Sequence, residues 1–307
     1  MFSLEISNLC KNFGKFKAVD QLCLKVTEGS VYGFLGPNGA GKTTTIKMIT
    51  GLSEPSGGSI KICGKEVAFG SSSGRENIGY LPDVPNFYSW MKPVEFLTFC
   101  GDLYRIDKKV LKTRIEELLD LVGLSDANRK VGGFSRGMKQ RLGIAQALIN
   151  EPALILMDEP ASALDPIGRK DVMDIISKLA GKTTVFFSTH ILADVERVCD
   201  RIAIIHKGKL IIEDTIESLR RDYSIKELEI ELIKVEDAAR FADKLKIQPW
   251  VGEIKSIDGN IVRVAVKDLL QAGTGIPAIL AGMNAGLIGL KSLEPTLEDI
   301  FMEVVSQ

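Results

Sequence analysis

The sequence has no long apolar run and no excess of charge of either sign. Its 307 residues carry 39 Lys and Arg against 40 Asp and Glu, which leaves a formal net charge of −1. A balance this even argues against a strongly basic nucleic-acid-binding protein and against an acidic disordered tail. No apolar stretch reaches the ~18 residues that a membrane-spanning helix requires. Residues 1–6 contain neither a basic nor a continuous apolar stretch, so we expect no signal peptide.

Cysteine is too sparse and too widely spaced for structural bridges or a zinc site. The chain has five cysteines, an odd number, and no two of them form a C-x-x-C pair. This spacing excludes a disulfide framework and a zinc-binding motif. We expect free, buried thiols in a reducing compartment.

Short apolar runs alternate with helical patterns through the first two thirds of the chain. We predict buried strands at residues 31–35, 153–157 and 183–188, a helix at 42–52, a mostly helical region within 93–150, and a hairpin at 205–209. Strands that alternate with helices are typical of a parallel sheet covered by helices, so the expected fold class is α/β.

The pattern changes after residue 213. We predict strands at 228–233, 251–257, 261–266 and 287–291, helices at 236–245, 276–284 and 296–304, and a turn at Asp258-Gly259-Asn260. The order β-α-β-β-α-β predicts a small ferredoxin-like α+β module. We therefore expect two domains, residues 1–217 and 218–307, with the boundary near 218–224.

A glycine-rich loop carries the strongest chemical signal. Gly36-Pro37-Asn38-Gly39-Ala40-Gly41-Lys42-Thr43 matches the pattern G-x-x-x-x-G-K-[ST] in full, follows a predicted strand and opens a predicted helix. In such a loop, backbone N–H groups and the helix N-terminus surround phosphate oxygens. Lys42 would contact the β- and γ-phosphates, and the Thr43 hydroxyl would ligate Mg²⁺. The alternative is a chance glycine turn before a helix.

Two carboxylates follow the predicted strand 153–157. Asp158 and Glu159 stand where open α/β sheets bind their ligands, at the carboxyl end of a strand. Asp158 fits the acid that holds Mg²⁺, and Glu159 is placed to polarise an attacking water. The alternative is that acidic residues commonly leave strands at turns, but the nearby phosphate loop favours function.

Three further segments complete a known pattern. Phe134-Ser135-Arg136-Gly137-Met138-Lys139-Gln140-Arg141 precedes the acidic pair, Ser162-Ala163-Leu164-Asp165 follows it, and Thr189-His190 ends the next strand. With Gly36–Thr44, these segments resemble the nucleotide-binding subunit of ABC transporters over residues 2–215. The resemblance implies a P-loop NTPase core with an N-terminal antiparallel β subdomain and an inserted helical subdomain at about 88–150. It also implies ATP and Mg²⁺ as cofactors, and two subunits that pair head to tail around two ATP molecules.

The resemblance assigns roles to individual residues. It places Thr44 in the phosphate loop, and Ser135, Gly137 and Gln140 in the signature motif that contacts the nucleotide of the opposite subunit. Asp165 matches the loop that senses that subunit, His190 matches the switch histidine beside the γ-phosphate, and Phe13 matches the aromatic residue that stacks on adenine. The simpler alternatives are a helix cap at Ser135, a structural role for His190 and a core position for Phe13.

The chain departs from the family pattern at two positions. Arg136 stands where the signature motif usually has glycine, and its role is open. Asp83 stands where the family's Q-loop usually has Gln. A carboxylate is a hard oxygen ligand, so Asp83 remains a candidate for Mg²⁺, directly or through water.

The loop after Asp83 contains three aromatic residues, Phe87, Tyr88 and Trp90. In the family this region receives a helix of the membrane subunit, so we predict that the three residues dock a permease chain. The alternative is that they pack within the helical subdomain.

One cassette with an acidic Q-loop residue and a tail of ~90 residues resembles the ABC-2 type ATPases, often exporters in bacteria. We therefore expect an ATPase at the cytoplasmic face of the membrane that powers a separate permease, with no nucleic-acid partner. The alternatives are a soluble ABC ATPase acting on ribosomes or nucleic acid, and a binding-only regulator. The presence of Lys42, Asp158, Glu159 and His190 argues against the regulator.

Overall fold

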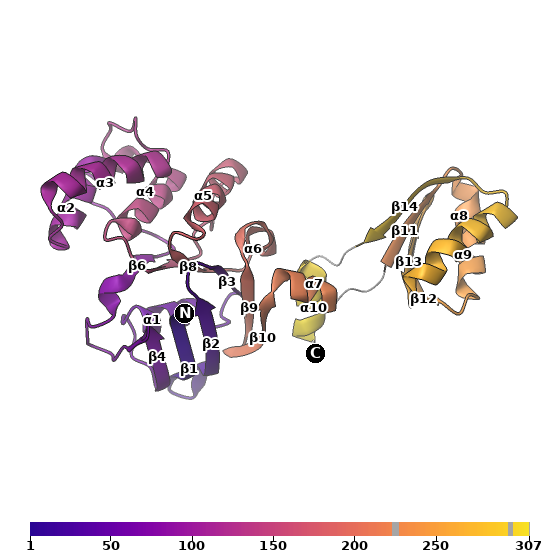
Figure 1. The fold of residues 1–307 in the computed structure, drawn as a ribbon, viewed down its shortest axis with the longest axis horizontal. Helices are drawn as coiled ribbons and strands as arrows, with labels where there is room; N and C mark the ends of the chain where they lie inside the picture. Colours follow the sequence, from indigo (N-terminus) through magenta and orange to yellow (C-terminus); the bar gives the residue numbers. More distant parts are fainter. Residues whose placement is uncertain (223–226, 294–296, 307) are drawn as a thin grey trace. The chain divides into compact units, whose positions relative to one another are not determined.

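The computed structural model describes residues 1–222, 227–293 and 297–306. It divides into two compact units, Met1–Ile216 and Glu217–Ser306. The helices and strands of both units are labelled in Figure 1. Within the described residues, no helix is long and apolar enough to span a bilayer.

The larger unit is built on a six-stranded sheet with the order β10-β9-β3-β8-β7-β6. The strands are β3 (Val31–Leu35), β6 (Ile78–Leu81), β7 (Leu154–Asp158), β8 (Thr184–Thr189), β9 (Arg201–His206) and β10 (Lys209–Thr215). β6, β7, β8, β3 and β9 run parallel, and β10 returns antiparallel to β9 through a turn at Lys207 and Gly208. Every residue of β3, β7 and β8 is buried, as expected for strands covered on both faces.

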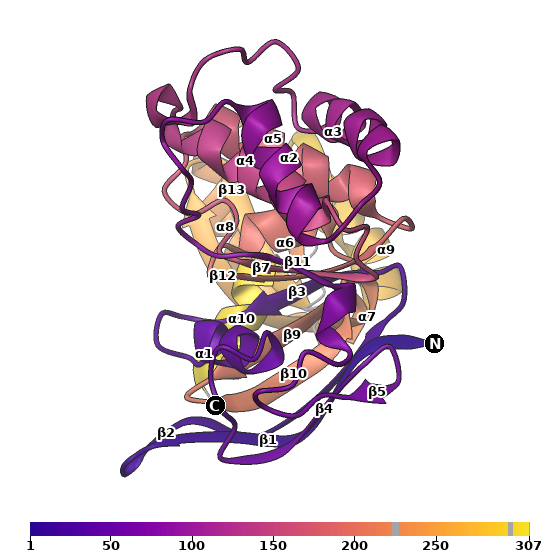
Figure 2. The same cartoon turned by 90° about the vertical axis from the view of Figure 1, so that its left-hand side faces the viewer.

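A second, antiparallel sheet lies below the central one (Figure 2). Its order is β2-β1-β4-β5, from β1 (Phe2–Phe13), β2 (Phe16–Thr27), β4 (Gly57–Ile62) and β5 (Lys65–Glu66). Helix α1 (Lys42–Ile49) packs between the two sheets, and its Ile46, Met48 and Ile49 share one core with Leu4 and Phe34. This shared core fixes the start of α1, and with it the phosphate loop, against both sheets.

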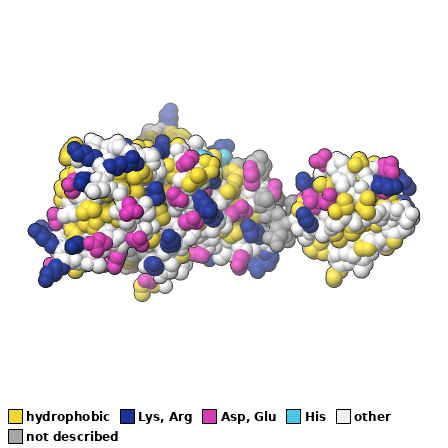
Figure 3. Space-filling view, turned by 90° about the horizontal axis from the view of Figure 1, so that it is seen from above, with side chains coloured by type: hydrophobic (Ala, Val, Ile, Leu, Met, Phe, Trp, Pro, Cys, Tyr) yellow, Lys and Arg dark blue, Asp and Glu magenta, His cyan; other side chains and the backbone are white. Residues whose placement is uncertain are grey.

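The opposite face of the central sheet carries the remaining helices of this unit (Figure 1). They are α2 (Pro93–Leu103), α3 (Lys108–Leu121), α4 (Arg136–Leu148), α5 (Pro166–Leu179) and α6 (Leu192–Val198). Helices α2, α3 and α4 form the inserted helical subdomain, and α4 returns to pack on β6. Figure 3 shows Lys and Arg intermixed with Asp and Glu on the visible face of this unit.

The smaller unit has a ferredoxin-like core. Its elements are α7 (Ile216–Asp222, which spans the division), β11 (Glu227–Leu232), α8 (Val235–Lys246), β12 (Val251–Asp258), β13 (Ile261–Val266), α9 (Leu269–Gly282), β14 (Leu287–Leu293) and α10 (Leu297–Ser306). The antiparallel sheet has the order β12-β13-β11-β14. Leu228, Ile230 and Leu232 point to one face of β11 and pack with Phe241 of α8 in a separate core.

Two predicted helices differ from the structure by three residues or more at one end. The first ends at Ile49 rather than at residue 52, because Gly51 adopts a φ of 78° that ends the helical path. The helix predicted at 276–284 begins at Leu269, where the Asp268 side chain accepts hydrogen bonds from Leu270 N and Gln271 N. The helix continues through Pro277, which the sequence interpretation had placed near its start. Thr296, the predicted start of the last helix, lies outside the described residues.

Candidate active site

The glycine-rich loop connects β3 to α1 and is held tightly by its surroundings. Gly41 has a φ of 109°, and a Cβ there would meet the Ala18 carbonyl oxygen at 2.5 Å. Any other residue would therefore be both strained and obstructed at this position. The Lys42 side chain is buried, and its Nζ donates to the carbonyl oxygens of Gly36 (2.7 Å) and Pro37 (3.2 Å). The loop thus keeps its amides and its ammonium group together at a helix N-terminus, an arrangement that favours phosphate.

The two carboxylates after β7 face this loop. Asp158 is 3% exposed, and its Oδ1 accepts hydrogen bonds from Ser188 Oγ (2.6 Å) and Thr43 Oγ1 (3.1 Å). Glu159 Oε1 lies 3.2 Å from Lys42 Nζ, and Glu159 Oε2 lies 2.9 Å from His190 Nδ1. Six residues from three segments of the chain therefore converge at the carboxyl edge of the sheet.

The backbone at Glu159 is strained. Its φ is 49°, in a region that residues with a Cβ rarely occupy. The surrounding structure holds it there, because Glu159 N donates to Ser188 O and Ser188 Oγ, each at 3.1 Å. Such strain clusters at functional sites, where it fixes the direction of a reacting side chain. Here it turns the Glu159 carboxylate toward Lys42 and His190.

These residues open onto a cavity of about 450 Å³. It is lined by Phe13, Phe16, Ala18, Asn38, Gly39, Gly41, Lys42, Thr43, Thr44, Asp83, Glu159, Ser162 and His190. Phe13 belongs to β1 and is 56% exposed, so it is not a core residue, and the Lys11 ammonium lies 5.1 Å from its ring centre. The cavity therefore combines a phosphate cradle, an aromatic face at the rim, and three carboxylate or imidazole groups.

Asp83 borders the cavity from the loop after β6. Burial raises the pKa of Asp83, Arg136 opposes this rise, and the carboxylates of Asp158 and Glu159 add to it. Burial also raises the pKa of Tyr80 to about 12, with Asp158 and Asp83 contributing. Negative charge is thus concentrated along this wall of the cavity.

The remaining motif residues lie outside this cavity. Ser135, Gly137 and Asp165 line a separate concavity of about 350 Å³. Ser135 caps α4 by accepting from Met138 N, and Asp165 caps α5 by accepting from Gly168 N. Gln140 is buried and lines a third, smaller cavity together with Asp83. Within one chain, the structure therefore separates the phosphate loop from the signature residues.

The aromatic residues after Asp83 divide into two groups. Phe87 packs edge-on against the buried Phe96 with ring centres 5.0 Å apart, which agrees with the packing alternative. Tyr88 and Trp90 are 42% and 61% exposed and lie beside each other, with ring centres 5.0 Å apart. Tyr88 also contacts Phe99 of α2, so an aromatic surface extends from the loop onto the helix.

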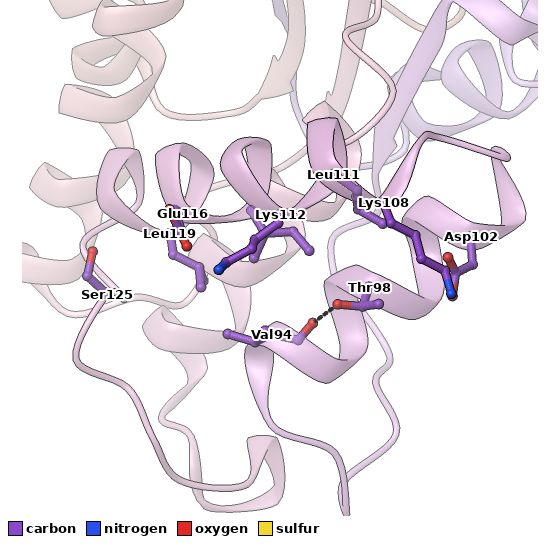
Figure 4. Close-up of a pocket in the computed structure, with 10 residues that line it drawn as sticks. Val94, Thr98, Asp102, Lys108, Leu111, Lys112, Glu116, Leu119 and Ser125 are labelled. Atoms are coloured by element: carbon purple, nitrogen blue, oxygen red, sulfur yellow. Dashed lines mark hydrogen bonds between the residues drawn. The ribbon is translucent and has the colours of Figure 1, made fainter.

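A groove of about 560 Å³ lies between α2 and α3 (Figure 4). Figure 4 shows Leu111 and Leu119 pointing into it from α3, and Val94 and Thr98 facing them from α2. No residue lining this groove belongs to a motif described above.

Sequence reasoning missed two contributions to the site. Ser188 ends the predicted strand at 183–188, but only the structure shows that its hydroxyl joins Asp158 to the Glu159 backbone. Arg169 of α5 donates to the buried Asp194 of α6 at 2.6 Å, which connects the helix after Asp165 to the helix after His190. The spacing of these charges along the chain gives no signal, because their contact is tertiary.

The site combines a phosphate loop with two carboxylates. Asp158 is buried and hydrogen-bonded to Thr43 of the loop, and Glu159 lies between Lys42 and His190. These features define a P-loop nucleotide hydrolase. Residues 19–162 match the ABC transporter family. The chain is 37% identical to the uncharacterized ABC transporter ATP-binding protein YxlF of Bacillus subtilis (strain 168), over 98% of this chain and 99% of that one. It is 42% identical to the bacitracin transport ATP-binding protein BcrA of Bacillus licheniformis, over 71% of each chain.

A solved structure shares the fold. It is the dimeric, post-hydrolysis state of the ATP-binding cassette MJ0796 bound to ADP and phosphate, with a TM-score of 0.62 and 26% identity over 69% of this chain and 98% of that one. The chain therefore belongs to the ATP-binding proteins of ABC transporters, and it is an ATPase.

Proposed function

We propose that this ATPase energises transport, in the export direction, through a separate membrane permease chain at the cytoplasmic face of the membrane. The observation that carries the proposal is the position of Glu159, between Lys42 at 3.2 Å and His190 at 2.9 Å. This arrangement suits hydrolysis of the phosphoanhydride bond of ATP, and the similarity to transport ATP-binding proteins supports its use in transport.

The contacts of Lys42 and Glu159 indicate how hydrolysis begins. Lys42 Nζ is held by two loop carbonyl groups and by Glu159. A nucleotide phosphate in the loop would attract the ammonium group and leave the Glu159 carboxylate to accept a proton from water. His190 contacts the other Glu159 oxygen and would keep the carboxylate oriented toward the γ-phosphate of a bound nucleotide. Hydrolysis therefore depends on these three side chains together.

The residues around Thr43 fit Mg²⁺. The Thr43 hydroxyl and the Asp158 carboxylate are hard oxygen donors whose atoms lie 3.1 Å apart, and Ser188 orients the carboxylate. Among the described residues there is no group of three or more His, Cys, Asp or Glu side chains that could hold a metal ion. A site with so few protein ligands suits Mg²⁺, which keeps several waters and is completed by substrate phosphates. When bound, Mg²⁺ would neutralise charge on the β- and γ-phosphates.

A second copy of the chain would complete the site. Ser135 and Gly137 lie at the N-terminus of α4, in a concavity separate from the phosphate loop. A head-to-tail pair would bring this helix N-terminus against the γ-phosphate held by the other copy. The dimeric cassette MJ0796 bound to ADP and phosphate supports this arrangement.

Tyr88 and Trp90 would dock the permease. Both are exposed and adjacent to each other, whereas Phe87 is committed to packing on Phe96. Exposed aromatic side chains are typical anchors for a partner helix. They lie in the loop that follows Asp83, so binding at this surface is connected along the chain to the nucleotide cavity.

Membrane recruitment tests this proposal. Co-expression with its permease should place the wild-type chain in the membrane fraction, and the double change Tyr88→Ala and Trp90→Ala should release it. The matched control is Ile247→Ala, which removes an exposed apolar side chain from the smaller unit and should leave recruitment unchanged. Full membrane recruitment of the aromatic double variant would refute docking at this surface.

A further inference from the structure

The two positions that depart from the family pattern lie against each other. Asp83 follows β6 of the core, and Arg136 is the first residue of α4 in the helical subdomain. Arg136 Nη2 lies 3.6 Å from Asp83 Oδ1. The separation exceeds hydrogen-bond distance, so the contact is an ion pair without a directed hydrogen bond. Two unusual residues of opposite charge thus meet between the core and the helical subdomain.

Asp83 borders two cavities. It lines the 450 Å³ cavity that contains Lys42, Glu159 and His190. It also lines a cavity of about 220 Å³, together with Arg136, Lys139 and Gln140 of α4 and with Val84 and Pro85. The Asp83 carboxylate is therefore the point at which the nucleotide cavity meets the start of α4.

The charge of Asp83 is poorly compensated apart from Arg136. Among the described residues, its shielded Oδ1 accepts no hydrogen bond. Asp158 and Glu159 lie close enough to raise the pKa of Asp83, and Arg136 acts in the opposite direction. A cavity that receives a polyanionic nucleotide therefore has an additional negative group on its wall, with a cation on its outer side.

We propose that Arg136 is a positioning residue for nucleotide binding: it holds the Asp83 carboxylate at the cavity wall and offsets its charge, so that the phosphates bind beside three carboxylates. Gln, the usual residue at position 83 in the family, would need no such cation. The ion pair is half exposed, so its contribution to fold stability is small, and its effect is on the affinity for nucleotide. This inference rests on the proposed function only in placing ATP in the 450 Å³ cavity.

The test is a mutant cycle read by ATP binding to the full-length chain. Calorimetric titration with ATP is performed once in EDTA and once with Mg²⁺, on wild type, Arg136→Gln, Asp83→Asn and the double variant. We expect Arg136→Gln to weaken ATP binding in EDTA about two- to fivefold, the range for an exposed charge pair. Asp83→Asn should bind ATP at least as tightly as wild type. In the Asp83→Asn background, Arg136→Gln should have little further effect, because the charge that it offsets is gone.

One conservative variant, a change of salt concentration and one control variant distinguish an effect of charge from an effect of structure. Arg136→Lys should restore wild-type affinity, and raising the salt concentration should reduce the difference between Arg136→Gln and wild type. Lys109→Gln removes an exposed cation of α3 that lines neither cavity, and it should leave the affinity unchanged. The proposal would be overturned if Arg136→Gln weakened ATP binding equally in the wild-type and the Asp83→Asn backgrounds. It would also be overturned if Arg136→Gln bound ATP with wild-type affinity. A wild-type chain that binds no ATP would overturn the proposed function as well.

Discussion

The orientation of the Glu159 side chain depends on its backbone conformation and on two neighbouring side chains. Its backbone has a φ of 49°, and its carboxylate contacts Lys42 and His190 at the same time. A carboxylate in this position can accept a proton only while it remains charged and oriented. Its removal should therefore affect hydrolysis far more than binding.

We predict that Glu159→Gln lowers the turnover number for ATP about 10²- to 10⁴-fold, the usual contribution of a positioned general base. The amide retains the shape of the side chain and loses the ability to accept the proton. Affinity for ATP should not weaken, because Lys42 loses a competing anion. Phosphate release and ATP titration measure the two effects, with Glu117→Gln on the exposed side of α3 as the control. A Glu159→Gln variant with wild-type turnover would remove Glu159 from this role.

At this scale, local sequence patterns selected residues that the structure brings together around one cavity, and they missed the tertiary partners of those residues. The loop Gly36–Thr43 and the pair Asp158-Glu159 were found because their spacing along the chain is itself the signal. The Ser188 hydroxyl contacts Asp158 across 30 positions of the chain, and Arg136 contacts Asp83 across 53 positions. No local sequence pattern indicates such contacts. Phe87 looked equivalent to Tyr88 and Trp90 in the sequence, but only its packing on Phe96 distinguishes it.

Among the secondary-structure elements, α5 and α6 are joined by two ion pairs, and only the Arg169–Asp194 pair includes a buried side chain. Arg169 Nε lies 2.6 Å from Asp194 Oδ1, and the Asp194 side chain is 5% exposed. Burial raises the pKa of Asp194, and the hydrogen bond from Arg169 opposes that rise. The pair therefore gives the buried carboxylate of α6, the helix that follows His190, a charged partner on α5.

We predict that Arg169→Gln lowers the free energy of unfolding by about 1–3 kcal/mol at neutral pH, because a buried acceptor loses its charged donor. The pKa of Asp194 should then rise further above its ordinary value of 3.8. A folded state that binds the proton more tightly gains stability as pH falls through that raised pKa, so the deficit should shrink toward acidic pH. Urea unfolding across this range measures the effect.

The control for this prediction is Arg197→Gln, which breaks the exposed pair with Asp174 between the same two helices. Exposed pairs contribute little, so the free energy of unfolding should change by less than about 1 kcal/mol. If Arg169→Gln and Arg197→Gln lowered the free energy of unfolding equally, burial of Asp194 would not be the reason for the larger expected loss.

The strands and helices themselves were predicted well where burial dominates. Strands 31–35 and 261–266 have the expected bounds, because fully buried or alternating apolar patterns are strong signals. The start of α9 was predicted seven residues late, since Gly273, Gly275 and Pro277 resemble breakers. The Asp268 cap and burial of Ala272 and Ile276 in the core of the smaller unit outweigh them.

The whole molecule consists of two units with separate cores. The core around Tyr32 and Phe34 lies in Met1–Ile216, and the core around Phe241 and Trp250 lies in Glu217–Ser306. Every residue that lines the 450 Å³ cavity around Lys42 belongs to the larger unit. Each unit therefore has a hydrophobic core that can support its folding without the other unit.

We predict that a chain truncated to residues 1–216 folds and binds ATP with the affinity of the full-length chain. Calorimetric titration and thermal unfolding measure this, and the Lys42→Ala variant of the truncated chain, which lacks the phosphate-binding ammonium group, serves as the negative control. An insoluble truncated chain, or one that binds ATP more than tenfold more weakly, would show that the smaller unit supports the site.

The contacts of Lys42 also bear on the kinetics of nucleotide capture. Its ammonium group donates hydrogen bonds to the carbonyl groups of Gly36 and Pro37, so the loop is held in an ordered shape before any phosphate arrives. A nucleotide then replaces contacts without folding a segment around itself, and little ordering entropy opposes binding. Association should accordingly proceed at a rate set by encounter, and differences in affinity among variants should reside in the dissociation rate.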